Sequence, residues 1–425
     1  VSCNKGDKDP RLVIITFDGL RWQEVFSGAE EGLVGNATYV ADPEALKTAY
    51  WRDTPEERRE TLLPFLWSYV PQNGYFLGNR NKGSRMSVSN TKNYSYPGYS
   101  EMFCGYADDE RVDSNDPVVN PNTNVLEVAA RDPRYQGQIM MLSSWESIRY
   151  AIANERAGIP GSSAHEPCYV ETCEADPFYK GKTTYILTCD HGRGHYGAFT
   201  SHGAGTRYSN ETWFIAFGKG IPALGETQDN GPFYTKQFAG MIASILGIDF
   251  TPDNGVKVEP FDPSFHEAPL PPTAEYTFKA VQDAAPKGNG LRYTYSEGDY
   301  LSVVPFLKAP VKKTGITPVL TTDMKLREDH FGLVLKGLMK IPADGLYELA
   351  ITSDDGSKLF FDGQLLFDID RDGGGVQSAW MDLEAGYHRL EVQYFENYGG
   401  EALEIGIEGP GVIYFNLPAD MLFYE

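Results

Sequence analysis

The chain has 425 residues and a formal net charge of −22, and 41% of its residues are hydrophobic and 23% charged. These values are typical of a globular protein, and the length favours two or three domains over one. The acidic balance disfavours a nucleic-acid backbone as partner, and no apolar run is long enough to cross a bilayer.

Residues 1–10 are polar and are expected to be an N-terminal tether. A Ser-Cys pair followed by Asn and a charged run resembles the processed end of a bacterial lipoprotein, which makes Cys3 the candidate lipidation site. The alternative is an incidental cysteine in a disordered terminus. Lipidation predicts an extracytoplasmic protein, periplasmic or on the outer surface of a bacterium, that contacts a membrane only through this lipid.

Apolar strand-like runs alternate with helix-like segments between residues 11 and 260. Pro64 marks either a helix start or a kink. The predicted buried strands are 11–17, 138–144, 183–189 and 211–218, and the predicted helices are 55–70, 123–130 and 235–247. This alternation predicts an α/β domain with a largely parallel sheet, in which functional residues gather beyond the carboxyl ends of the strands.

The pattern changes after residue 260. Residues 261–290 are rich in proline and are expected to be a linker. Short alternating segments with turn signals follow over 291–425, and they predict an all-β sandwich.

Five cysteines are present, of which Cys168 and Cys173 are close enough in sequence to form a disulfide. Cys104 and Cys189 lie in apolar surroundings and are expected to be buried thiols.

Polar residues follow two of the predicted strands. Asp18 follows the first strand, Asp190 and His191 end the strand at 183–189, and His202 comes shortly afterwards. Such groups are costly to bury unless something compensates them, and Zn²⁺ takes both carboxylate oxygen and imidazole nitrogen as ligands. A metal beside Ser95 would lower the pKa of its hydroxyl and make it a nucleophile. Asp18 taken alone is equally explained as a turn cap.

Three motifs together, VIITFDGLRWQEVF, SYPGYSEMFCG and TTYILTCDHGRG with SHG downstream, resemble the alkaline phosphatase superfamily. The resemblance is closest to its nucleotide pyrophosphatase/phosphodiesterase-like branch and covers about residues 11–250. It implies an alkaline-phosphatase-like domain over 11–260 that hydrolyses phosphate mono- or diesters with two Zn²⁺ ions.

The resemblance also assigns roles to individual residues. Asp18, Asp190 and His191 would hold one metal, and His202 would be a ligand of the other. Ser95 would be the nucleophile that bridges both metals.

The same resemblance makes Asn115 the residue that hydrogen-bonds a non-bridging oxygen of the substrate, with Asn120 and Asn122 as rivals. Sulfatases share the fold, but their nucleophile motif needs an arginine where Tyr99 stands here, which favours a phosphate ester over a sulfate ester.

One part of the family pattern is missing. The family supplies the second metal with an Asp-X-X-X-His segment between the strands predicted at 138–144 and 183–189, and this interval is short and lacks it. Three alternatives remain: a segment is absent from this sequence, His165, Glu166 or Asp176 substitute as ligands, or the second site is lost.

Residues 291–425 resemble the PA14 domain through KIPADGLYELAITSDDGSKLFFDGQLLFD and LEAGYHRLEVQYFENYGGEALEIGIEGPG. Several PA14 domains bind carbohydrate through a Ca²⁺ held by an Asp-Asp pair, and Asp354 and Asp355 stand at that motif. The alternative is that this pair serves only the geometry of a hairpin turn.

Two hypotheses follow for the whole chain. The first is a metal-dependent hydrolase of phosphate esters that a PA14 module targets to glycans. The second is a catalytically impaired surface lipoprotein on a phosphatase fold that acts as a glycan-binding or structural protein.

Overall fold

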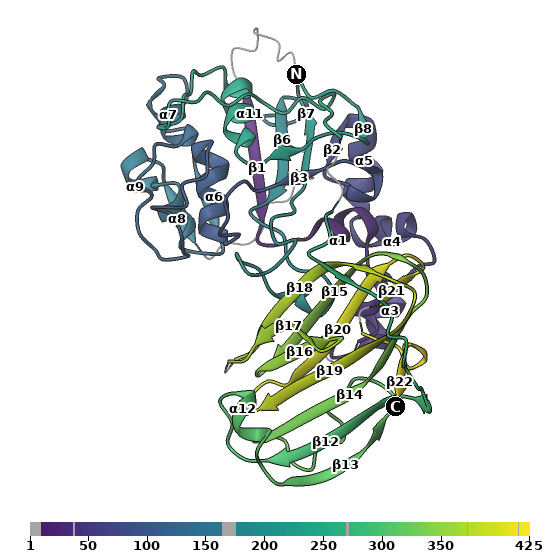
Figure 1. Ribbon diagram of the computed structural model, residues 1–425. Coiled ribbons are helices and arrows are strands. Elements are labelled where there is room, and N and C mark those ends of the chain that lie inside the picture. The colour runs from purple at the N-terminus through teal and green to yellow at the C-terminus, as the bar shows by residue number, and fades with distance from the viewer. Residues whose placement is uncertain (1–9, 37–38, 164–175, 269–271, 372, 415) are drawn as a thin grey trace. The chain divides into compact units, whose positions relative to one another are not determined.

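The computed structural model describes residues 10–36, 39–163, 176–268, 272–371, 373–414 and 416–425 (Figure 1). Its contacts divide the chain into two compact units. The first contains the described residues of Val1–Arg193, Ser201–Ala204 and Tyr208–Pro269, and the second those of Gly194–Thr200, Gly205–Arg207 and Leu270–Glu425. Predictions for Cys3, His165, Glu166, Cys168 and Cys173 fall outside the described residues.

The first unit contains a five-stranded sheet in the order β1-β6-β7-β2-β8. These strands are β1 (Arg11–Phe17), β6 (Thr183–Cys189), β7 (Phe214–Gly218), β2 (Gly74–Leu77) and β8 (Gly225–Glu226). Strand β7 runs antiparallel to both of its neighbours, β6 and β2, whereas the β1–β6 and β2–β8 pairs are parallel. The sheet is therefore mixed: four strands share one direction and β7 opposes them.

The prediction of a buried strand at 138–144 is wrong. Only Met141–Ser143 forms a strand, β4, and among the described residues it pairs with β5 (Gly161–Ser163) in a separate two-stranded sheet. Met140 and Leu142 are 67% and 51% exposed. An apolar run is buried only where neighbours cover both faces, and so short a ladder does not provide that cover.

Helices of the first unit follow several of the predicted signals. Helix α5 starts at Pro64, and helix α11 ends before Gly247, whose φ of +60° is the left-handed conformation that glycine adopts readily. Helix α7 begins at Val125, two residues after the predicted start at 123, and its N-cap is Asn124, whose side chain accepts from Glu127 N–H. The helices are α1 (Trp22–Ser27), α2 (Glu31–Val34), α3 (Pro43–Tyr50), α4 (Pro55–Leu62), α5 (Pro64–Asn73), α6 (Ser95–Cys104), α7 (Val125–Arg131), α8 (Ile148–Ala151), α9 (Asn154–Ala157) and α11 (Gln237–Leu246).

Both faces of the central sheet are covered (Figure 1). Along β7, Phe214 and Ala216 face a core with residues of α6, α7 and α11, whereas Ile215 and Phe217 face a core with residues of α1 and α5. This alternation is the two-residue period of a strand with both faces buried, which explains why β6 and β7 are continuous apolar runs.

The second unit is the expected β-sandwich. One sheet has the order β10-β18-β15-β20-β21, and the other is built around β14 and β19, with β12 and β13 off its main path. Inward residues of both sheets, such as Leu335 and Ile351, share one core. The strands are β10 (Tyr276–Phe278), β11 (Gly288–Asn289), β12 (Leu291–Glu297), β13 (Val311–Thr317), β14 (Phe331–Ile341), β15 (Gly345–Asp354), β16 (Ser357–Phe361), β17 (Gln364–Ile369), β18 (Gly375–Leu383), β19 (Gly386–Glu396), β20 (Ala402–Gly409), β21 (Val412–Tyr414) and β22 (Leu422–Tyr424).

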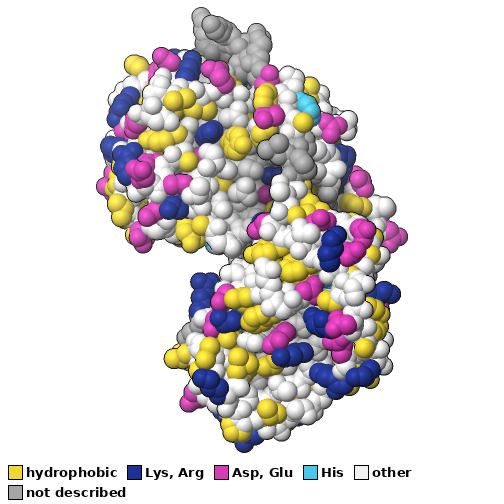
Figure 2. Space-filling view, in the orientation of Figure 1, with side chains coloured by type: hydrophobic (Ala, Val, Ile, Leu, Met, Phe, Trp, Pro, Cys, Tyr) yellow, Lys and Arg dark blue, Asp and Glu magenta, His cyan; other side chains and the backbone are white. Residues whose placement is uncertain are grey.

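Residues predicted as linker take part in both units. Phe261 is fully buried in the core of the first unit, and β10 pairs with β18 in the second. None of the described helices has the length and apolar character needed to span a bilayer. On the face drawn in Figure 2, carboxylates and cations of the described residues are interspersed.

Candidate functional site

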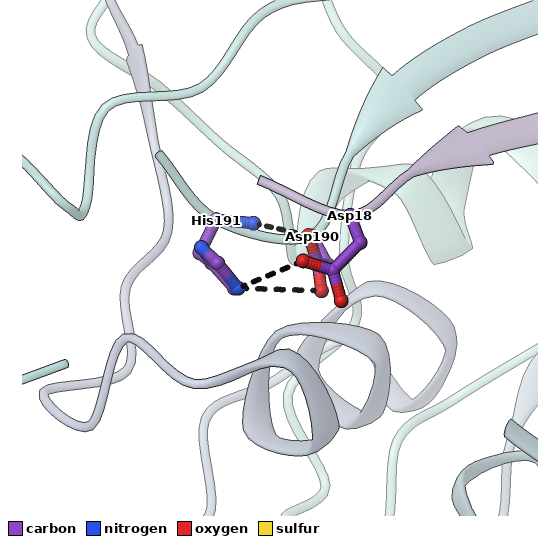
Figure 3. Close-up of side chains that lie close together, drawn as sticks. All are labelled: Asp18, Asp190 and His191. Carbon is purple, nitrogen blue, oxygen red and sulfur yellow. Dashed lines mark hydrogen bonds and ion pairs between the residues drawn. The ribbon is translucent and has the colours of Figure 1, made fainter. Parts of the chain in front are cut away.

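The ends of β1 and β6 bring three of the predicted metal ligands together (Figure 3). The two strands pair in parallel, with Phe17 opposite Cys189, so the next residues, Asp18 and Asp190, lie side by side at one edge of the sheet. One ligand atom from each of Asp18, Asp190 and His191 lies within 4.8 Å of the others. Asp190 and His191 are fully buried, whereas the side chain of Asp18 is 53% exposed.

Asp190 is a buried carboxylate that is only half satisfied. Its Oδ1 accepts hydrogen bonds from the backbone N–H groups of Gly19 (3.0 Å) and His191 (2.9 Å). Its Oδ2 is buried without a hydrogen bond among the described residues. Burial, reinforced by the neighbouring Asp18, raises the pKa of Asp190 to about 7. A cation at Oδ2 would remove this cost.

The ring of His191 is oriented for a ligand. Its Nδ1 lies 2.7 Å from the carbonyl oxygen of Gly192, which can only accept, so Nδ1 carries the proton and Nε2 presents a lone pair. Nε2 lies 3.6 Å from Asp190 Oδ2 and 3.8 Å from Asp18 Oδ1. Burial lowers the pKa of His191, which favours the neutral form of the ring. A bare nitrogen that faces two carboxylates is a donor set suited to Zn²⁺.

Ser95 is the first residue of α6 and lies against this group. Its buried hydroxyl donates to Asp18 Oδ2 over 3.1 Å, and its Oγ is also 3.1 Å from His191 Nε2. The hydroxyl therefore contacts two of the three candidate ligands. The helix N-terminus at Ser95 further favours negative charge at this point.

Gly98 lets α6 approach the end of β6. A Cβ atom at this position would lie 2.2 Å from the backbone oxygen of Asp190, closer than non-bonded atoms allow. We expect Gly98→Ala to displace α6, to weaken Zn²⁺ binding about tenfold or more, and to lower stability by about 1–3 kcal/mol. Isothermal titration with zinc and thermal unfolding measure both effects.

Gly205→Ala is the matched control, because a Cβ atom there meets nothing within 4 Å. Unchanged zinc affinity in Gly98→Ala, with the control also unchanged, would show that the close contact between helix and strand does not position Ser95.

Asn115 lies in a later loop, and its side chain contacts the start of α6. Its Oδ1 accepts the backbone N–H of Tyr96 over 2.9 Å, which leaves its Nδ2 group as a donor. Asn120 and Asn122 are fully buried and bond to structural partners, namely Ser100 and Ala151 for Asn120 and Tyr106 and Asp108 for Asn122. The two rivals are thus engaged in the fold, and Asn115 alone of the three lies beside Ser95.

His202 lies beside the three candidate ligands Asp18, Asp190 and His191 but is not one of that group. Its ring stacks on that of His191, with centroids 4.2 Å apart, and the edge of Tyr94 packs against it at 5.9 Å. Burial first, and then His191 and Arg193, lower the pKa of His202 to about 4. The described ranges hold no second group of three metal-ligating side chains, and the alternative ligand Asp176 is exposed and bonds to Phe178 N–H.

Two residues near the site were not predicted from the sequence. Arg193 approaches Asp18, and Glu101 on α6 ties the loop at 89–90 to residues 235–236. Arg193 stands inside the DHGRG motif, so its charge could have been noticed there. The partners of Glu101 are far from it in sequence, and no local pattern identifies them.

In the second unit, Asp355 is buried and both of its carboxylate oxygens are hydrogen-bonded. Oδ1 accepts from Gly373 N–H (2.7 Å) and Oδ2 from Asn397 N–H (2.8 Å), so Asp355 holds two loops in place. Glu396 is buried nearby, and its Oε1 makes no hydrogen bond among the described residues. Burial, together with Asp355 and Asp354, raises the pKa of Glu396 to about 7. Strands β15 and β16, which flank the Asp354-Asp355 pair, belong to different sheets, so the pair does not lie in a hairpin turn, and a carboxylate oxygen without a hydrogen bond lies close to it.

Comparison with known proteins identifies the second unit. Residues 287–420 match the family model of the PA14 domain, so this part of the chain is a PA14 domain. No curated protein matches the chain. The alkaline-phosphatase resemblance of the first unit remains a prediction.

Several solved structures are similar to this chain. The PA14 sugar-binding domain from an RTX adhesin is 17% identical, with 32% of this chain and 99% of that chain covered and a TM-score of 0.27. The PA14 domain of MpAFP antifreeze protein is 17% identical, with 34% and 96% covered and a TM-score of 0.27. An anti-sigma factor domain-containing protein from Clostridium clariflavum is 21% identical, with 41% and 58% covered and a TM-score of 0.29. This chain spans 49% of the length of a further anti-sigma factor domain-containing protein.

Proposed function

We propose that the first unit is a metal-dependent hydrolase of phosphate mono- or diesters in which Ser95 is the nucleophile. The observation that carries the proposal is the position of Ser95 Oγ, 3.1 Å from both Asp18 Oδ2 and His191 Nε2. The unbonded, buried Oδ2 of Asp190 supports a cation at this place. Asp18, Asp190 and His191 would hold one Zn²⁺, and His202, whose ring stacks on that of His191, stays the proposed ligand of the other metal.

Named side chains of this chain can carry out the steps of phosphate-ester hydrolysis. Zn²⁺, when bound, supplies charge that polarises the ester and lowers the pKa of the serine hydroxyl. Asp18 Oδ2 takes the proton of Ser95 Oγ as this oxygen attacks phosphorus, and the P–O bond to the ester alcohol breaks as that proton passes to the departing oxygen. Water then cleaves the phosphoserine, which restores the hydroxyl and releases phosphate or a phosphomonoester. The Nδ2 group of Asn115 is placed to donate to a non-bridging oxygen.

The second metal of the family has no complete ligand set among the described residues. This observation favours the rival proposal, a catalytically impaired phosphatase scaffold that serves as a glycan-binding or structural protein. Lipidation at Cys3, with an extracytoplasmic location, belongs to both proposals.

The deciding experiment is zinc content per chain, together with turnover of nitrophenyl phosphate mono- and diesters by the wild type and by Ser95→Ala. We expect at least one Zn²⁺ per chain in both proteins, and turnover that falls by about a thousandfold or more in the variant. Zinc-loaded wild type without Ser95-dependent turnover would reject the hydrolase and leave the rival.

For the second unit, we propose that the PA14 domain binds glycans through Ca²⁺ at Asp354 and Asp355. The family match and the unbonded carboxylate oxygen of buried Glu396 support a cation beside this pair. Ca²⁺ prefers such oxygen ligands.

A glycan array probed with the full chain in calcium and in EDTA tests this proposal. We expect binding in calcium that is lost in EDTA and in Asp354→Ala, and unchanged in Ser95→Ala. Absence of glycan binding in calcium, or binding that survives EDTA, would refute it.

A further inference from the structure

Arg193 brings a positive charge to the metal-binding end of the sheet. It comes two residues after His191, and its Nη2 lies 3.6 Å from Asp18 Oδ1. Its Nε donates to the backbone oxygen of Gly19 over 3.0 Å. The side chain is 27% exposed, so it lies where a ligand from solvent can reach it.

The backbone beside Arg193 is shaped to receive its guanidinium. Gly19 has a φ of +55°, and a Cβ atom at this position would lie 2.7 Å from Arg193 Nε and 2.9 Å from Nη2. Gly19 also donates its N–H to Asp190 Oδ1. The same glycine therefore binds a candidate metal ligand through its nitrogen and the guanidinium through its oxygen, which fixes Arg193 relative to the metal site.

A charge count shows what this arginine adds. Asp18 and Asp190 carry two negative charges when ionised, and the imidazoles of His191 and His202 would bind a metal in their neutral form. One divalent ion cancels the two carboxylates and leaves no net attraction for an anion. The described residues assemble one such ligand group, and Arg193 places a positive charge 3.6 Å from its member Asp18, where the guanidinium can meet a phosphate oxygen.

We propose that Arg193 is a catalytic residue that binds the phosphoryl group and supplies charge which a second metal would otherwise provide. The planar guanidinium donates to two oxygens of a phosphate at once, a geometry that lysine cannot reproduce. This inference rests on the proposed function of the same site. It differs from that proposal because the zinc ligands and the nucleophile do not require Arg193.

The test is isothermal titration of inorganic phosphate into zinc-loaded wild type, Arg193→Gln and Arg193→Lys. We expect phosphate affinity to fall about 10- to 100-fold in Arg193→Gln and by less in Arg193→Lys, which keeps the charge but loses the paired donors. Arg134→Gln, at an exposed arginine after α7, is the control and should match the wild type.

Zinc affinity separates this role from a structural one. If Arg193 acts through its charge, its replacement should leave the affinity for zinc unchanged or raise it. If Arg193 only positions Asp18, its replacement should lower the affinity for zinc. Unchanged phosphate affinity, or zinc affinity that falls in parallel, would overturn the inference while the proposed function stands. A wild type that binds no zinc would overturn both.

Discussion

Asp190→Asn is expected to stabilise the metal-free protein and at the same time to abolish its zinc binding. Asparagine keeps the oxygen that accepts from Gly19 and His191, and it replaces the buried, unbonded Oδ2 with an uncharged NH₂ group 3.6 Å from His191 Nε2. Relief of an uncompensated buried charge should raise the free energy of unfolding by about 1–2 kcal/mol. Loss of a ligand should weaken zinc binding about 100-fold or more.

Asp18→Asn is the matched control because it removes a ligand of the same group that is half exposed. It should weaken zinc binding similarly but leave the stability of the metal-free protein nearly unchanged. Thermal unfolding in EDTA and zinc titration measure the two quantities. If Asp190→Asn destabilises the metal-free protein, the carboxylate has a structural partner and the argument for a cation at Oδ2 fails.

Glu101→Ala is expected to cause the largest loss of stability. The buried carboxylate accepts hydrogen bonds from the backbone of Ser89, Asn90 and Lys236 and from the side chains of Asn90 and Thr235. Truncation would leave these donors unpaired, which should lower the free energy of unfolding by about 3–5 kcal/mol. Because α6 begins at Ser95, zinc affinity should fall as well.

Urea unfolding followed by tryptophan fluorescence measures this effect in the first unit. That unit contains all of the tryptophans except Trp380. Glu101→Gln should lower the free energy of unfolding by less, because its one side-chain oxygen still accepts hydrogen bonds. Glu60→Ala, on the exposed face of α4, should have the same free energy of unfolding as the wild type. Equal stability of Glu101→Ala and Glu60→Ala would contradict the structural role given to Glu101.

Local patterns predicted the two strands that carry the candidate metal ligands, but not helix α6, which begins at Ser95. The runs at 11–17 and 183–189 are β1 and β6 at the predicted bounds, and Asp18 and Asp190 follow them directly. The run at 138–144 has similar composition but lies at the surface, because burial depends on which segments cover a strand and not on its own residues. The same limit applies to β7, whose direction against β6 is set by the path of the chain between them.

Patterns in the sequence predicted that a carboxylate and an imidazole follow a buried strand, and that residues 291–425 form a β-sandwich. These features depend on residues that are neighbours along the chain. Three features follow from the folded chain alone: Ser95 contacts both Asp18 and His191, Asp190 Oδ2 has no hydrogen bond among the described residues, and Arg193 lies beside Asp18. Each of these features involves segments that are far apart in sequence. The parallel pairing of β1 with β6 and the close approach of α6 at Gly98 bring these segments together.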